Sequence, residues 1–214
     1  MDMVRGKILP HRRRRELRTD YKTRLKLLRS RAPRLVVRKY LNNIQCQIID
    51  YKPAGDVVLA AATARELKGF GWTTNTGNIP AAYLTGLLCG LRAKKTIKSA
   101  ILDLGLQTSV KGARVYSALK GAIDAGLEIP HSEEILPDVG RISGKHVADY
   151  AALLKKEKPT QYKKMFSAYL AVNSTPENLP KQFEEVKSKI LAGSLVIKAD
   201  KPKTAVPKKK KVEE

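Results

Sequence analysis

Two neighbouring stretches of the chain, 34–42 and 43–51, alternate between apolar and polar side chains. This two-residue period is typical of β-strands with one buried face. The Asn42-Asn43 pair between them suits a hairpin turn. A third apolar stretch, 56–64, follows the turn at 53–56, although its alanine-rich end would also suit a helix. The pattern therefore predicts a three-stranded antiparallel meander.

The predicted meander has two different faces. The apolar face is formed by Leu35, Val37, Ile44, Cys46 and Ile48. The opposite face carries Arg34 and Arg38 together with two glutamines. In an antiparallel sheet the second face is commonly solvated. Its arginines also make it a candidate surface for a charged partner.

The next segments predict helices around one further strand. Residues 79–95 are almost wholly apolar as far as Leu91, which indicates a buried core helix, with Asn78 as its cap and Pro80 in its first turn. The short apolar run 99–106 suits a central strand covered on both sides, and 112–126 is amphipathic and helical. The order βββαβα predicts an α+β domain with helices on a sheet.

Four parts of the chain differ in composition. Residues 1–16 look extended, and Thr19 or Asp20 can cap a short helix over 20–31. The predicted parts are a basic arm with a short helix (1–33), the α+β core (34–130), a loop with helices near 146–157, 159–171 and 178–192 (131–197), and a disordered Lys/Pro-rich tail (198–214).

Charge adds the strongest functional signal. The 214 residues hold 42 Lys and Arg against 20 Asp and Glu, a net charge of +22, and residues 1–40 alone carry +12. The stretch 11–31 has ten basic residues and two acids, Glu16 and Asp20. Such a stretch repels itself unless a polyanion neutralises it. It is either a solvated arm or a segment that lies along phosphates.

Nucleic acid fits this charge better than a membrane does. No apolar run approaches the roughly 18 residues needed to span a bilayer, and no apolar run follows the N-terminal charges as in a secretory signal. The chain is therefore expected to be cytoplasmic. Aromatic residues make up 6% of the chain, too few for base stacking, which favours recognition of folded RNA through phosphates, 2′-hydroxyls and shape. No helix-turn-helix stands out for binding DNA.

The sequence offers no convincing catalytic or metal site. Cys46 and Cys89 stand alone in apolar stretches and are expected to be buried thiols, and the three histidines lack metal-ligand spacing. Asp50, Asp56, Asp103 and Asp124 invite comparison with a two-metal nuclease. Such a site needs an acid in the first strand, and 34–42 has none. We expect no enzyme activity, no cofactor and no bound metal.

Several separated blocks resemble a known family. They include "RRRRELRTDYKTRLKLLRSRAPRLVVRKYLNNI", "GWTTNTGNIPAAYLTGLLCG", "KGAIDAGLEIPHSEE" and "RISGKHVADYA". In this order they are similar to the archaeal-type large-subunit ribosomal proteins of the L-eighteen family, over about residues 5–171. Residues 172–214 match no family pattern.

The resemblance implies a structural RNA-binding protein with an α+β sandwich of the translational-machinery type. Members of the family bind 5S rRNA and help attach it to the large-subunit rRNA in the central protuberance, beside other ribosomal proteins. The basic arm would then lie along rRNA phosphates. The RNA-contact candidates are Arg12, Arg13, Arg14, Arg15, Arg18, Lys22, Arg24, Lys26, Arg29, Arg31, Arg34, Arg38, Trp72, Asn75, Asn78, Arg141, Lys145 and His146.

Some of these assignments leave alternatives open. Trp72 suits an RNA contact and a core residue equally, and His146 suits an RNA contact and a helix cap equally. Tyr21, Tyr83 and Tyr116 are better explained as packing residues. Two further functions also compete with the ribosomal one, namely a free RNA chaperone or processing factor using the same surface, and a metal nuclease.

Overall fold

A computed structural model describes residues 9–193. Its centre is a four-stranded sheet with the spatial order β3-β2-β1-β4. The strands are β1 (Arg34–Lys39), β2 (Ile44–Lys52), β3 (Gly55–Thr63) and β4 (Ile101–Asp103). β2 runs antiparallel to both β1 and β3, and β4 runs parallel to β1. The mixed α+β class expected from the pattern is confirmed.

The alternation along β1 and β2 identifies the buried face correctly. Leu35, Val37, Ile44, Cys46 and Ile48 are all fully buried. β3 is extended as far as Thr63, so its alanine-rich end is strand and not helix. The expected central strand at 99–106 is wrong in both length and place. β4 lies at the edge of the sheet beside β1. It has only three residues, because Gly105, with φ +63°, turns the chain two residues after its end.

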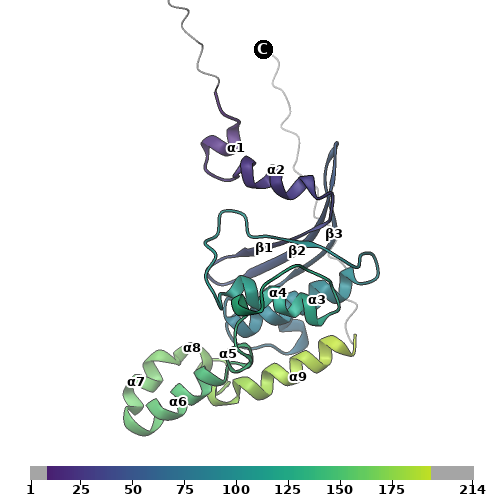
Figure 1. Cartoon of the computed structure of the whole chain (residues 1–214). Coiled ribbons are helices and arrows are strands. Elements are labelled where there is room, and N and C mark those ends of the chain that lie inside the picture. The colour runs from purple at the N-terminus through teal and green to yellow at the C-terminus, as the bar shows by residue number, and fades with distance from the viewer. Residues whose placement is uncertain (1–8, 194–214) are drawn as a thin grey trace, which may run out of the picture.

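Two helices cover the apolar face of the sheet, as Figure 1 shows: α3 (Ile79–Ala93) and α4 (Arg114–Asp124). Asn78 caps α3 by accepting a hydrogen bond from Ala81 N at 2.9 Å, as expected. The two helices cross very closely. A methyl group at Gly86 would collide with the backbone of Ala118, and one at Gly121 with the backbone of Tyr83. Glycine at both crossing points is therefore a packing requirement.

The C-terminal helices form a further layer and a projection. They are α5 (Val139–Ser143), α6 (Lys145–Glu157), α7 (Pro159–Met165), α8 (Ser167–Leu170) and α9 (Leu179–Leu191). α9 lies against α3, and its buried side chains belong to the same core as the sheet, so this core extends beyond residues 34–130. α6, α7 and α8 project from this body around a small core of their own (Figure 1). The expected helix over 159–171 is interrupted at Phe166.

The N-terminal segment lies on the other face of the sheet (Figure 1). It contains α1 (Arg12–Arg15) and α2 (Tyr21–Arg29). Of the two expected candidates, Asp20 and not Thr19 caps α2, by accepting hydrogen bonds from Lys22 N and Thr23 N at 2.9 and 3.3 Å. The extended conformation expected for 1–16 is wrong at 12–15, which form one helical turn. Residues 1–8 and the tail 198–214 lie outside the described residues.

Candidate nucleic-acid interface

The basic arm, residues 9–31, presents its cations to solvent. α1 has no buried residue, and the side chains of Arg12 and Arg18 are 76% and 69% exposed. Glu16 lies 3.7 Å from Arg12 and 3.3 Å from Arg18, and therefore offsets only part of this charge. Exposed ion pairs of this kind contribute little to stability. The arm is therefore a cationic surface available to a polyanion.

The same holds for the outer side of α2. Lys22, Lys26, Arg29 and Arg31 are exposed. Asp20 serves the helix and not a ligand, because its carboxylate accepts from the Thr23 hydroxyl at 2.6 Å as well as from two backbone N–H groups. These hydrogen bonds, led by that of Thr23, lower the pKa of Asp20.

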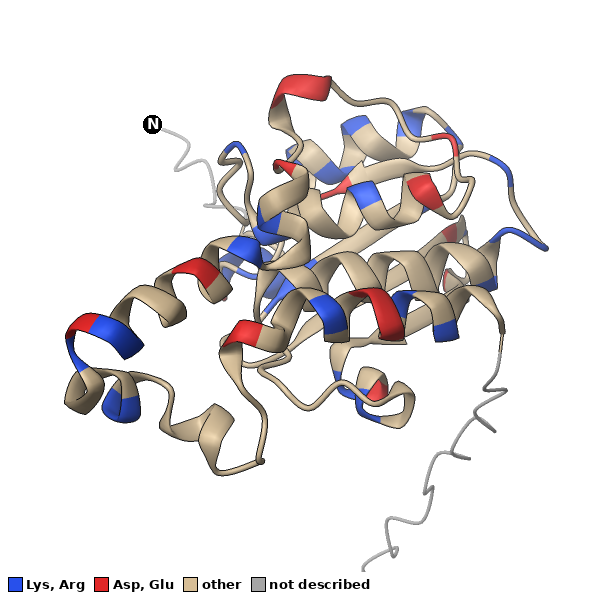
Figure 2. Ribbon diagram, turned by 90° about the horizontal axis from the view of Figure 1, so that it is seen from below, with Lys and Arg blue, Asp and Glu red and all other residues tan. Residues whose placement is uncertain are grey.

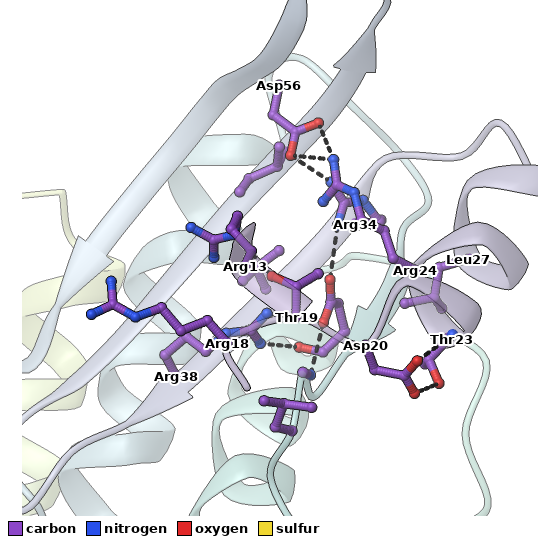
Figure 3. A pocket seen from close by; sticks show the side chains of 15 residues that line it. Arg13, Arg18, Thr19, Asp20, Thr23, Arg24, Leu27, Arg34, Arg38 and Asp56 are labelled. Carbon is purple, nitrogen blue, oxygen red and sulfur yellow. Dashed lines mark hydrogen bonds and ion pairs between the residues drawn. The ribbon is translucent and has the colours of Figure 1, made fainter. Parts of the chain in front are cut away.

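A chain of ion pairs connects α2 with the sheet (Figure 3). Arg24 of α2 donates to both oxygens of Asp56 at 2.9 Å. Arg34 of β1 donates to Asp56 at 3.0 Å and to Asp103 at 2.8 Å, so one guanidinium joins two carboxylates. Arg38 donates to the same Asp103 at 3.0 Å. These ion pairs therefore fix α2 across the second face of the sheet.

This arrangement corrects the role expected for Arg34. Its side chain is 2% exposed and enclosed by Asp56 and Asp103, so it does not present a free surface to RNA. Arg24 is also engaged by Asp56, with its side chain 31% exposed. Arg38 keeps a partly open position, with its side chain 32% exposed. The β-strand period predicts the face correctly, but it does not show that the arm covers that face.

A cavity of about 190 Å³ lies between the arm and the sheet (Figure 3). We call it the arm cavity. It is lined by Arg13, Arg18, Thr19, Asp20, Thr23, Arg24, Leu27, Arg34, Val36, Arg38, Ile49, Asp56, Asp103, Gly105 and Leu106. Five arginines against three aspartates give its wall a positive balance.

The loop before α3 has a structural role at most of its positions. Trp72 is 1% exposed and its indole N–H donates to the carbonyl of Asn75 at 3.2 Å, so the core alternative holds for this residue. Asn78 is the cap of α3. Asn75 remains exposed, although its side-chain oxygen accepts from Gly77 N at 2.6 Å.

The candidates on α5 and α6 lie far from the arm. Arg141, Lys145 and His146 are exposed, and they lie on the helical side of the sheet, opposite α1 and α2 (Figure 1). Gly144, not His146, occupies the cap position of α6. The helical side, seen from below in Figure 2, mixes acidic and basic residues. The structure therefore separates the expected site into an arm group and a smaller helical group.

The carboxylates that suggested a nuclease do not form a metal site. Asp56 and Asp103 are taken by arginines, while Asp124 accepts from the Tyr83 hydroxyl at 2.7 Å and lies 3.2 Å from Lys120. Within residues 9–193, no group of three or more His, Cys, Asp and Glu side chains is arranged to hold a metal ion. In the same part of the chain, no helix is long and apolar enough to cross a membrane.

The sequence pattern did not indicate that Asp56 and Asp103 would pair with the arginines of the second face. Asp56 begins the predicted third strand, and Asp103 lies within the predicted strand 99–106. Only the pairing of β1 with β4, which sets Val36 opposite Asp103, brings the second acid to the arginines. The prediction of buried thiols is confirmed, because Cys46 and Cys89 are both fully buried. Burial raises the pKa of both thiols, that of Cys89 to about 12.

Comparison with known protein families is consistent with a cationic nucleic-acid-binding surface on the arm. The family model described as ribosomal large subunit proteins 60S L5 and 50S L18 matches residues 8–100 and 94–132. These matches include the arm, the whole sheet and both helices on its apolar face, and they span more than half of the chain. The family consists of structural components of the ribosome and not of enzymes. The chain therefore belongs to this family and is an rRNA-binding protein of the large subunit of the cytoplasmic ribosome.

Proposed function

We propose that this protein binds 5S rRNA and helps attach it to the large-subunit rRNA in the central protuberance, in contact with neighbouring ribosomal proteins. The observation that carries the proposal is the exposed cationic arm fixed on one face of a family-matched domain. The arm supplies phosphate contacts, and the rigid domain supplies a surface of defined shape. Both are suited to folded RNA, which is recognised largely by shape and backbone.

The RNA contacts are proposed for the exposed members of the expected set. They are Arg12, Arg13, Arg14, Arg15, Arg18, Lys22, Lys26, Arg29, Arg31, Arg38 and Asn75, with Arg141, Lys145 and His146 as a separate group. Arg24 and Arg34 act indirectly, by fixing α2 on the sheet. The two groups lie on opposite sides of the sheet, an arrangement suited to contacting two RNA segments.

Selective binding tests the proposal. The purified protein is titrated against 5S rRNA and against a tRNA at physiological salt, and we expect clearly tighter binding to 5S rRNA. Equal affinities would contradict the proposal and leave a general polyanion binder. A free chaperone or processing factor would be indicated instead if the protein failed to co-sediment with large subunits in low-magnesium gradients.

A further inference from the structure

The arm cavity has acceptors that are already used. Asp56 accepts three hydrogen bonds from Arg24 and Arg34. Asp103 accepts from Arg34, from Arg38 and, at 2.8 Å, from the backbone N–H of Gly105. The third acid of the wall, Asp20, is engaged by the start of α2. A ligand that brings donors would therefore find the carboxylates occupied.

The hydrogen-bond donors of the arm cavity, by contrast, are in excess of its acceptors. The Nε of Arg34 is buried, and within residues 9–193 it has no hydrogen-bond partner. Arg13 donates through Nε to the neutral hydroxyl of Thr19 at 2.9 Å, and Arg18 pairs with Glu16, which is not part of the cavity wall. Buried polar groups are normally paired, so an unpaired donor behind the wall of a cationic cavity indicates that this wall is short of acceptors.

We propose that the arm cavity binds one phosphate group of an RNA backbone. This inference rests on the proposed function and adds a specific site to it. A volume of about 190 Å³ is many times the roughly 10–15 Å³ that one water molecule needs by the same measure, enough for a phosphate with adjoining ribose atoms but not for a length of strand. The phosphate would sit between the arm and β1, where the guanidinium groups of Arg34 and Arg38, which are 2% and 32% exposed, are less screened than those on the outer arm.

The site would also order the arm on the domain. Its wall includes Arg13, Arg18 and Arg24 from the arm and Arg34 and Arg38 from β1. A phosphate between them would join the two parts through charge-assisted hydrogen bonds. The arm would then add a fixed contact to its general attraction for RNA.

Two double variants with the same charge change separate this site from general attraction. Arg13→Gln with Arg18→Gln alters two residues of the cavity wall, whereas Arg12→Gln with Arg15→Gln alters two residues of the same segment outside it. Affinity for 5S rRNA is measured at several salt concentrations. We expect the wall pair to lose at least tenfold more affinity than the control pair. Equal losses would overturn the proposal, since a solvated arm depends only on total charge.

A second pair of variants keeps the charge constant. Leu106 lines the cavity and is 56% exposed, so Leu106→Trp should obstruct it, while Leu41→Trp adds the same side chain at an exposed position outside the wall. Only the first should weaken RNA binding, by about fivefold or more, with both variants retaining the circular dichroism spectrum and melting temperature of the wild type. Unchanged binding by Leu106→Trp would contradict the proposal.

The source of the phosphate is tested by nuclear magnetic resonance of the Arg34 Nε–Hε group. RNA should shift this signal, and inorganic phosphate should do so weakly and be displaced by RNA. If inorganic phosphate saturates the site and RNA does not displace it, the cavity is a free-anion site and the RNA proposal is wrong. The ratio of 5S rRNA to tRNA affinity in the wild type tests the proposed function, while the difference between wall and control pairs tests the cavity with either RNA.

Discussion

At the scale of single residues, Arg34 is the clearest case of a charge whose role depends on tertiary structure. It lies on the face that the strand period assigns to polar residues, yet it is 2% exposed and held by two carboxylates. A buried guanidinium is tolerated only when its charge and donors are compensated. Its contribution is therefore to fix the arm and to charge the cavity.

Replacement of Asp103 by asparagine tests this role. Asp103→Asn removes the negative charge between Arg34 and Arg38, and breaking a buried ion pair costs about 3–5 kcal/mol of folding free energy. Urea denaturation should show a loss in this range, while Asp149→Asn, at an exposed position of α6, should change little. A loss below about 1 kcal/mol would contradict the structural role. Metal-dependent RNA cleavage abolished by Asp103→Asn would instead support a nuclease.

Residue-level prediction from sequence worked where local pattern decides. The buried face of β1 and β2, the Asn78 cap and the buried tyrosines Tyr83 and Tyr116 all follow from period or residue type and are confirmed. It failed where a distant segment decides. Arg34 is buried because α2 and Asp103 come from elsewhere in the chain to cover it.

At the scale of elements, α9 completes the core although it lies beyond the matched family region. Leu179, Phe183, Val186 and Ile190 form one helical stripe, and each is at most 3% exposed. The ring centroids of Phe183 and of Tyr83 on α3 are 5.5 Å apart. The packing of this stripe against the core is what mainly stabilises the helix, because isolated short helices are only marginally stable in water.

Truncation of Phe183 measures this contact. Phe183→Ala should lower the free energy of unfolding by about 3–5 kcal/mol, through lost burial and the resulting cavity. Leu191→Ala on the same helix, where the side chain is 54% exposed, should stay within about 0.5 kcal/mol. Both are measured by urea unfolding. Similar effects at the two positions would show that α9 does not stabilise the core.

The elements differ in how well the sequence pattern predicts them. α3 and α4 were predictable because their apolar positions lie within the helices themselves and because Asn78 marks the start of α3. β4 was misjudged because an apolar run does not reveal whether a neighbour exists on both sides. The single turn of α1 carries no burial pattern at all. At the candidate interface most of the arm arginines are exposed, whereas Arg34 is enclosed and Trp72 takes the core alternative, because packing overrides residue type at these two positions.

At the scale of the whole molecule, the net charge is concentrated in the N-terminal part of the chain. Residues 1–40 carry +12 of the net +22, and the arm lies on the face of the sheet opposite α3 and α4. The helical side mixes both signs (Figure 2). Affinity and selectivity can therefore reside in different parts. The arm supplies many salt-sensitive contacts, while the folded domain supplies fewer contacts of fixed geometry.

Deletion of residues 1–18 tests this division. It removes seven basic residues, and each phosphate contact contributes roughly 0.7–0.9 to the slope of log affinity against log salt. If about half of the seven contact phosphate, the slope should flatten by about three units. Arg38→Ala should flatten it by at most about one, because Asp103 already offsets part of that charge. Lys189→Ala, on α9 and remote from the arm, is the control and should leave it unchanged.

Selectivity should respond differently from affinity. Because the folded domain presents the surface of fixed shape, the ratio of 5S rRNA to tRNA affinity should survive the deletion better than either affinity does. The measurement is a salt titration of the four proteins against both RNAs. An unchanged slope after deletion would show that the arm is only solvated on 5S rRNA. A collapse of the ratio with the slope would place the selectivity in the arm itself.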